Sequence, residues 1–142
     1  MERWHTNEEI AEFIGAFEAC TLPHAAWTHR AHLTVALWYL SYCSQQEATH
    51  LIRTGIQRYN EACGVITTDT SGYHETITLF FIWFVKRYLE TNGSNRPLFE
   101  VASEFIERHG DKNLPLEYYS KGRLMSREAR YGWVEPDLKP LA

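Results

Sequence analysis

The stretch that most constrains this chain is the apolar run at residues 77–85, which reads ITLFFIWFV. Its β-branched and aromatic residues would also suit a buried strand. Length decides between helix and strand, because residues 86–90 (KRYLE) continue the run with good helix formers and Gly93 can end it. The run reaches about half the length that a membrane span needs. It therefore predicts the central helix of a soluble helical bundle.

Local signals place further helices before and after this run. The sequences TNEE at residues 6–9 and SQQE at residues 44–47 have the form of capping boxes. Thr28 is a good N-cap for another helix, and Gly64 suits a left-handed C-cap. Apolar residues then recur at helical spacing after each start signal. The sequence predicts an all-α fold whose five main helices lie near residues 7–20, 28–42, 44–62, 73–91 and 96–109.

The predicted architecture is a single-domain up-down bundle covering residues 1–142, because the loops are short and no linker interrupts the chain. Residues 111–142 contain three prolines and break the helical pattern. We expect an irregular C-terminal tail packed over the bundle, with a short helix near residues 116–121 and another after Ser126.

Composition excludes some classes of protein. The net charge of −4 and the sequence pI of about 6.0 argue against a nucleic-acid-binding protein, which needs a basic surface. The start MERWH is already polar, so no signal peptide is expected. The three cysteines are odd in number and widely spaced, which fits reduced thiols better than disulfides. The sequence thus predicts a cytoplasmic protein that acts on a small molecule and not on a membrane.

Two short motifs contain the histidines of interest. Residues 27–33 read WTHRAHL, and residues 72–76 read GYHET. His29 and His32 are three residues apart, so on a helix both can address one point. In an up-down bundle the helices near 28–42 and 73–91 are parallel, which brings His74 to the same end.

This arrangement predicts a metal site. Histidines at a helix N-terminus tend to be neutral at pH 7, which is the form that binds metal. His29, His32 and His74 would bind a divalent transition metal such as zinc, iron, nickel or manganese. Glu75 or Asp69 would supply a fourth ligand or act as general base on a metal-bound water, and Tyr73 would orient the substrate.

The same residues also have purely structural interpretations. The histidines can be core residues whose hydrogen bonds are satisfied by carbonyl or carboxylate groups. Glu75 can simply cap free backbone N–H groups near its helix start. Arg127, Arg130 and Lys121 can form a solvated face of the tail, or they can bring positive charge to an anionic substrate.

The WTHRAHL and GYHET motifs, together with WVEPDL at residues 133–138, resemble a family of small uncharacterised bacterial helical proteins. The resemblance covers most of the chain and implies no activity, substrate or catalytic residue. The first hypothesis is therefore a small-molecule metalloenzyme with its histidines at one end of the bundle. The alternative is a non-catalytic module of the same fold that binds a small ligand or a partner.

Overall fold

The computed structural model describes residues 3–141, and within them every regular element is a helix. This confirms the predicted all-α fold. The five long helices are α1 (Asn7–Glu18), α2 (His29–Tyr42), α3 (Gln45–Ala62), α4 (Glu75–Asn92) and α5 (Leu98–His109). None of the described helices is both long and apolar enough to span a membrane.

The helix starts follow the predicted caps. The Thr6 hydroxyl accepts a hydrogen bond from the Glu9 backbone N–H, and the Glu9 carboxylate accepts one from the Thr6 N–H, which completes the first capping box. Thr28 and Ser44 cap α2 and α3 through their hydroxyls. Gly64, just beyond α3, has a φ of 75°, a left-handed conformation that glycine adopts without strain.

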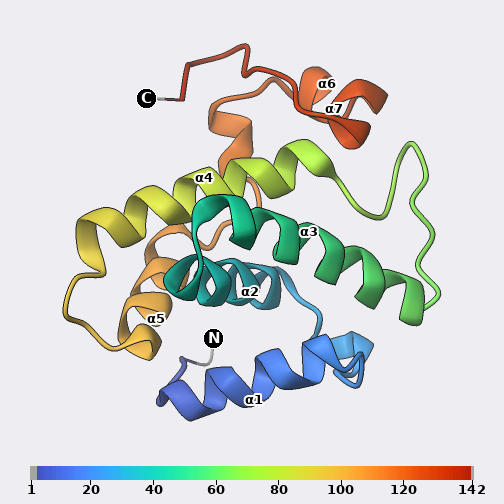
Figure 1. Cartoon of the computed structure of the whole chain (residues 1–142). Coiled ribbons are helices and arrows are strands. Elements are labelled where there is room, and N and C mark those ends of the chain that lie inside the picture. Colours follow the sequence, from blue (N-terminus) through green and yellow to red (C-terminus); the bar gives the residue numbers. More distant parts are fainter. Residues whose placement is uncertain (1–2, 142) are drawn as a thin grey trace.

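Figure 1 shows α1, α2, α3 and α4 alternating in direction, so that α2 and α4 run the same way. Two residues, 43–44, connect α2 to α3, whereas residues 19–28 connect α1 to α2 and the longer loop 63–74 leads from α3 to α4 (Figure 1). The short 3₁₀ helix η1 (His24–Ala26) lies between α1 and α2. The up-down order places the N-termini of α2 and α4 at one end of the bundle, as the sequence predicted.

Helix α2 lies at the centre of the core. Eight of its fourteen residues are buried, and it packs against α1, α3, α4 and α5. The apolar run in α4 supplies Phe80, Phe81, Ile82 and Val85 to the same core. The core therefore forms between helices that are distant in sequence, and it fixes the relative positions of their N-terminal ends.

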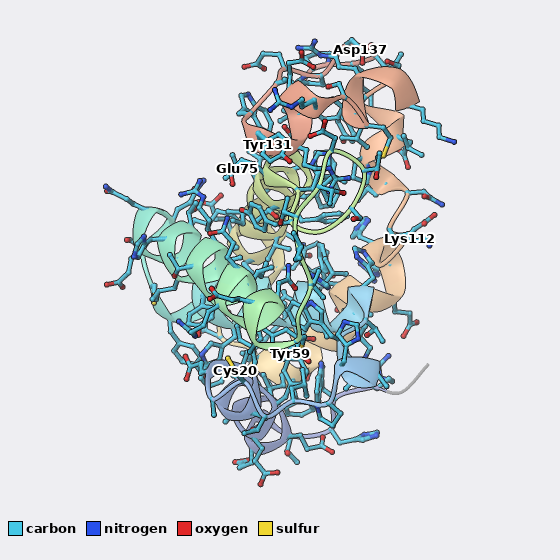
Figure 2. All side chains as sticks on the ribbon, turned by 90° about the vertical axis from the view of Figure 1, so that its right-hand side faces the viewer. Cys20, Tyr59, Glu75, Lys112, Tyr131 and Asp137 are labelled. Carbon is cyan, nitrogen blue, oxygen red and sulfur yellow. The ribbon has the colours of Figure 1, made fainter. Side chains whose placement is uncertain are left out.

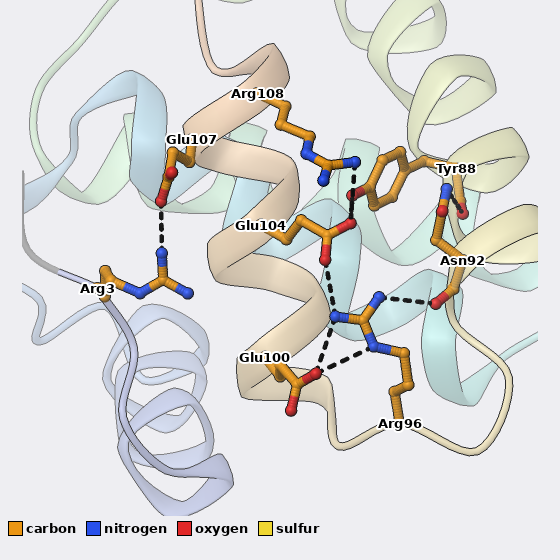
Figure 3. Close-up of polar contacts among 8 residues, drawn as sticks. All are labelled: Arg3, Tyr88, Asn92, Arg96, Glu100, Glu104, Glu107 and Arg108. Atoms are coloured by element: carbon orange, nitrogen blue, oxygen red, sulfur yellow. Dashed lines mark hydrogen bonds and ion pairs between the residues drawn. The ribbon is translucent and has the colours of Figure 1, made fainter.

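A cluster of charged side chains joins α4 to α5 (Figure 3). The Arg96 guanidinium, in the connecting loop, donates to the Asn92 carbonyl, to Glu100 and to Glu104. Glu104 also accepts a hydrogen bond from the Tyr88 hydroxyl and pairs with Arg108. These contacts make Glu104 the centre of the cluster.

The tail folds over α4, as predicted, but the helix expected near residues 116–121 is replaced by two shorter ones on either side of residues 118–120. It contains η2 (Leu114–Glu117), α6 (Lys121–Leu124) and α7 (Arg127–Tyr131), and Figure 1 shows α6 and α7 lying on the far side of α4 from α1. The buried Thr76 hydroxyl donates to the Gly132 carbonyl at 2.7 Å and accepts from the Val134 N–H at 3.2 Å. The tail is thereby fixed to the N-terminal turn of α4.

Candidate functional site

A cavity of about 300 Å³ lies at the end of the bundle where α2 and α4 begin. This volume is at the lower end of the range typical of small-molecule sites. Its walls come from α2, α3, α4 and the segment that precedes α4. The lining residues are His29, His32, Leu33, Ala36, Ile52, Ile56, Asn60, Gly72, Tyr73, His74, Ile77, Thr78, Phe81 and Ile82. Most of these side chains are aliphatic or aromatic, so the polar groups are few.

His29 lies in the first turn of α2, where Thr28 caps the helix. Its Nε2 atom is buried and has no hydrogen-bond partner within the described residues. The ring packs edge-on against Phe81, with 5.1 Å between the ring centroids. A buried nitrogen without a partner costs free energy that a bound polar group can recover.

His32 follows one turn later on the same wall. Its Nδ1 lies 2.9 Å from the Thr28 carbonyl oxygen, so this nitrogen carries the proton and donates. Nε2 is then the nitrogen with a free lone pair. The ring packs closely against Trp27, with 3.9 Å between centroids, and this contact fixes its orientation.

His74 is the N-cap of α4, not a residue within its first turn as the sequence suggested. Its Nδ1 accepts a hydrogen bond from the Ile77 backbone N–H at 3.1 Å. Its Nε2 must then carry the proton, which it donates to the Leu124 carbonyl at 2.7 Å. Both ring nitrogens are occupied, so His74 has no lone pair to offer a metal in this conformation.

The three histidines share an electrostatic environment. Burial, together with the nearby His32, lowers the pKa of His29 to about 4. Burial also lowers the pKa of His32 and of His74, and the positive charge of Arg130 adds to the effect at His74. All three imidazoles are therefore neutral at pH 7, and burial is the largest cause of each shift.

Glu75, the first residue of α4, does not line the cavity. Its carboxylate pairs with both Nε and Nη2 of Arg53, at 3.0 and 2.6 Å, and accepts a hydrogen bond from the Tyr73 hydroxyl at 2.6 Å. Tyr73 therefore contributes its ring to the cavity and its hydroxyl to this ion pair. The carboxylate predicted as a ligand or base is held by three donors.

Asp69 also lies outside the cavity lining. Its side chain is 62% exposed and pairs with the exposed Arg127 at 3.3 Å. The structure thus brings together His29, His32, Tyr73 and His74 around one cavity and places both predicted carboxylates elsewhere. Within residues 3–141, no three His, Cys, Asp or Glu side chains are arranged to bind one metal ion. The three-histidine metal site stays a prediction.

Two polar side chains of the cavity were not identified from the sequence. Thr78 lies four residues after His74, so its place on the same face of α4 follows from helical periodicity. Asn60 comes from the last turns of α3, and nothing in its local sequence marks it. No protein-family model matches this chain, and neither a curated protein nor a solved structure shows significant similarity to it.

Proposed function

We propose that this protein binds a small, mainly apolar molecule in the cavity between α2, α3 and α4. The observation that carries the proposal is a cavity with largely apolar walls on which one histidine has a buried nitrogen without a partner. Such a combination of apolar surface and few polar groups is typical of small-molecule sites.

The cavity also indicates what kind of ligand fits. Leu33, Ile56 and Ile82 favour an aliphatic or aromatic body, because burying apolar surface provides most of the binding free energy. The neutral His29 and His32 favour an uncharged polar group, such as a hydroxyl, that can both donate and accept. Neither ring carries a charge that would attract an ion at pH 7.

Calorimetric titration with 2-naphthol and with naphthalene tests this proposal. Both probes have the same aromatic body, but only 2-naphthol can bond to histidine. We expect 2-naphthol to bind more tightly by roughly 2- to 10-fold, the value of one hydrogen bond. In His29→Phe the preference for 2-naphthol should shrink, because an aromatic ring remains but the His29 nitrogens are removed and only His32 can still bond to the hydroxyl.

Ala36→Leu should abolish binding of both probes, because the longer side chain fills space in the cavity wall. Ala11→Leu, at an exposed position on α1, is the matched control and should bind like the parent protein. Binding that survives Ala36→Leu, or no binding of either probe to the parent protein, would contradict the proposal.

A second candidate is a metal-dependent enzyme that acts on a small molecule at the same place. His32 favours it, because a histidine that donates Nδ1–H to a backbone carbonyl and keeps Nε2 free has the arrangement common to metal ligands. His29 would be the second ligand, and substrate or water would complete the coordination of the ion. Glu75 and Asp69 would take part only after leaving Arg53 and Arg127.

Titration of the metal-free protein with zinc separates the two candidates. A metal site requires His29→Ala and His32→Ala each to weaken zinc binding by orders of magnitude, whereas the exposed His24→Ala should have no effect. His74→Asn should also leave zinc binding unchanged, since His74 serves as a cap. Equal zinc affinity in all four variants would reject the metal-dependent candidate and leave the ligand-binding proposal intact.

A further inference from the structure

Arg130, in α7, is a buried cation. Only 7% of its surface is exposed. Its Nε donates to the Asp69 carbonyl at 3.1 Å, and its Nη1 donates to the carbonyls of Gly72 and Tyr73 at 3.1 and 3.3 Å. No carboxylate within residues 3–141 forms an ion pair with it. A buried charge satisfied only by neutral groups is costly, and a bound counter-ion removes that cost.

The guanidinium also has unused donors. It carries five N–H groups in a planar fork, and the bonds to the loop involve only Nε and Nη1. Nη2 makes no hydrogen bond to a described residue, yet it is not among the atoms sealed from solvent without a partner. Nη2 is therefore reachable from solvent and can donate to a bound ligand.

Arg130 lines a second pocket, of about 340 Å³, beside the cavity described above. Arg53, Gln57, Glu75 and Tyr131 are among its other lining residues. Glu75 and Tyr131 lie next to one another in Figure 2, at the N-terminal end of α4. The pocket thus places hydrogen-bond donors from α3 and α7 around a common space.

The charges around this pocket do not cancel. The Glu75 carboxylate is neutralised by Arg53, with which it forms two hydrogen bonds. The Asp69 carboxylate pairs outside with Arg127. The positive charge of Arg130 is left without a matching negative charge, so the pocket carries a net charge of about +1.

We propose that this second pocket binds a small oxyanion, the carboxylate or phosphate group of a small molecule. Nη2 of Arg130 donates to the anion, and the Gln57 amide and Tyr131 hydroxyl add neutral donors. Guanidinium groups suit both kinds of anion because their planar fork matches the spacing of two oxygens. The proposal does not depend on the apolar cavity, because its donors Arg130, Gln57 and Tyr131 do not line that cavity and the ligand is of a different class.

Calorimetric titrations with inorganic phosphate and with acetate test the proposal, each at constant ionic strength adjusted with chloride. We expect at least one of the two to bind to the parent protein at one site. Arg130→Met should weaken that binding by roughly tenfold or more, because it removes a charge-assisted hydrogen bond. Lys121→Met is the matched control: it removes an equal charge from the exposed start of α6, outside the pocket lining, and should bind like the parent protein.

Tighter binding of phosphate would assign the site to a phosphate group, and tighter binding of acetate would assign it to a carboxylate. Equal weakening in Lys121→Met and Arg130→Met would overturn the proposal, because it indicates only general surface attraction. Absence of binding by both anions would overturn it as well.

Arg130→Met could unfold the loop that Arg130 supports, so a measurement on the unmodified protein is also needed. The side-chain amide signals of Gln57 can be followed by NMR during the same anion titrations. A saturable shift of these signals, together with weaker binding in Gln57→Leu at this exposed position, supports the site. Unchanged Gln57 signals on saturation with anion would overturn it.

Discussion

The imidazole of His74 bonds to two backbone groups that are far apart in the chain, the Ile77 N–H and the Leu124 carbonyl. One ring therefore caps the N-terminus of α4 and holds the tail against it. This dual role requires the neutral form with its proton on Nε2. A charged imidazolium would place a second N–H against the Ile77 N–H and break the cap.

His74→Ala should lower the free energy of unfolding by about 1–3 kcal/mol, because it removes the cap and leaves the Leu124 carbonyl without its donor. His74→Asn should recover part of this loss, since asparagine is a good N-cap. Thermal unfolding of the two variants beside the parent protein measures the difference. Equal melting temperatures for His74→Ala and the parent would show that the cap contributes nothing.

The sequence predicted which side chains lie near one another, but it did not predict which groups they bond to. His29, His32, Tyr73 and His74 were predicted to meet, and they line one cavity. The partners of Glu75 and Arg130 were not predictable: Arg53 is 22 residues away from Glu75, and Arg130 bonds to backbone carbonyls, which every residue carries. Side-chain identity does not encode such contacts, because the first depends on how α3 packs beside α4 and the second on how the tail docks.

At the level of helices, the joint between α4 and α5 depends on Glu104. Hydrogen bonds from Arg96 and from the Tyr88 hydroxyl hold the pKa of this carboxyl at about 2, below its ordinary 4.5. The ionised Glu104 therefore adds to the free energy of unfolding. Its contribution is complete above pH 4.5 and is lost as the pH falls towards 2, because Glu104 in the unfolded chain is protonated at a higher pH than in the folded protein.

Glu104→Gln should therefore be less stable than the parent at pH 7, and the difference should shrink as the pH decreases through this range. Urea unfolding of both proteins at several pH values provides the measurement. The exposed Glu107→Gln, which affects only the pair with Arg3, is the matched control. A difference between Glu104→Gln and the parent that stays constant down to pH 2 would contradict the role assigned to Glu104.

Helices were the most predictable level of this structure. Thr6, Thr28 and Ser44 cap the helices that their sequence predicted, because an N-cap needs only a side-chain oxygen and local geometry. The sequence placed the start of α4 at residue 73, before the observed start at Glu75, because histidine is an uncommon N-cap and was not recognised as one. The start of α5 was also placed too early, because Pro97 occupies its N-cap position.

At the level of the whole molecule, burial is unequal among the helices. Eight of fourteen residues of α2 are buried, against three of twelve in α1. Opening α2 exposes the centre of the core, whereas α1 can separate at lower cost. The up-down order of the helices could be predicted from the sequence. The docking of the tail could not, because it depends on contacts such as those of Thr76, which no sequence pattern indicates.

Hydrogen exchange should reflect this inequality. Amide protons in the middle of α2 should exchange only through global unfolding, and those of α1 should exchange faster by a local opening. Exchange followed by mass spectrometry over a series of denaturant concentrations distinguishes the two routes. Equal protection of α1 and α2 would indicate that the bundle opens as one cooperative unit.

Tyr73 lies between the cavity and the second pocket and contributes to the walls of both. If occupation of one space displaces its ring, the affinity for the other ligand changes, and thermodynamic reciprocity requires the same factor in both directions. Two chemically different compounds would then regulate each other across a single aromatic ring. Titration of 2-naphthol in the presence and absence of saturating phosphate measures that factor, and a ratio of one would show that the two compartments act independently.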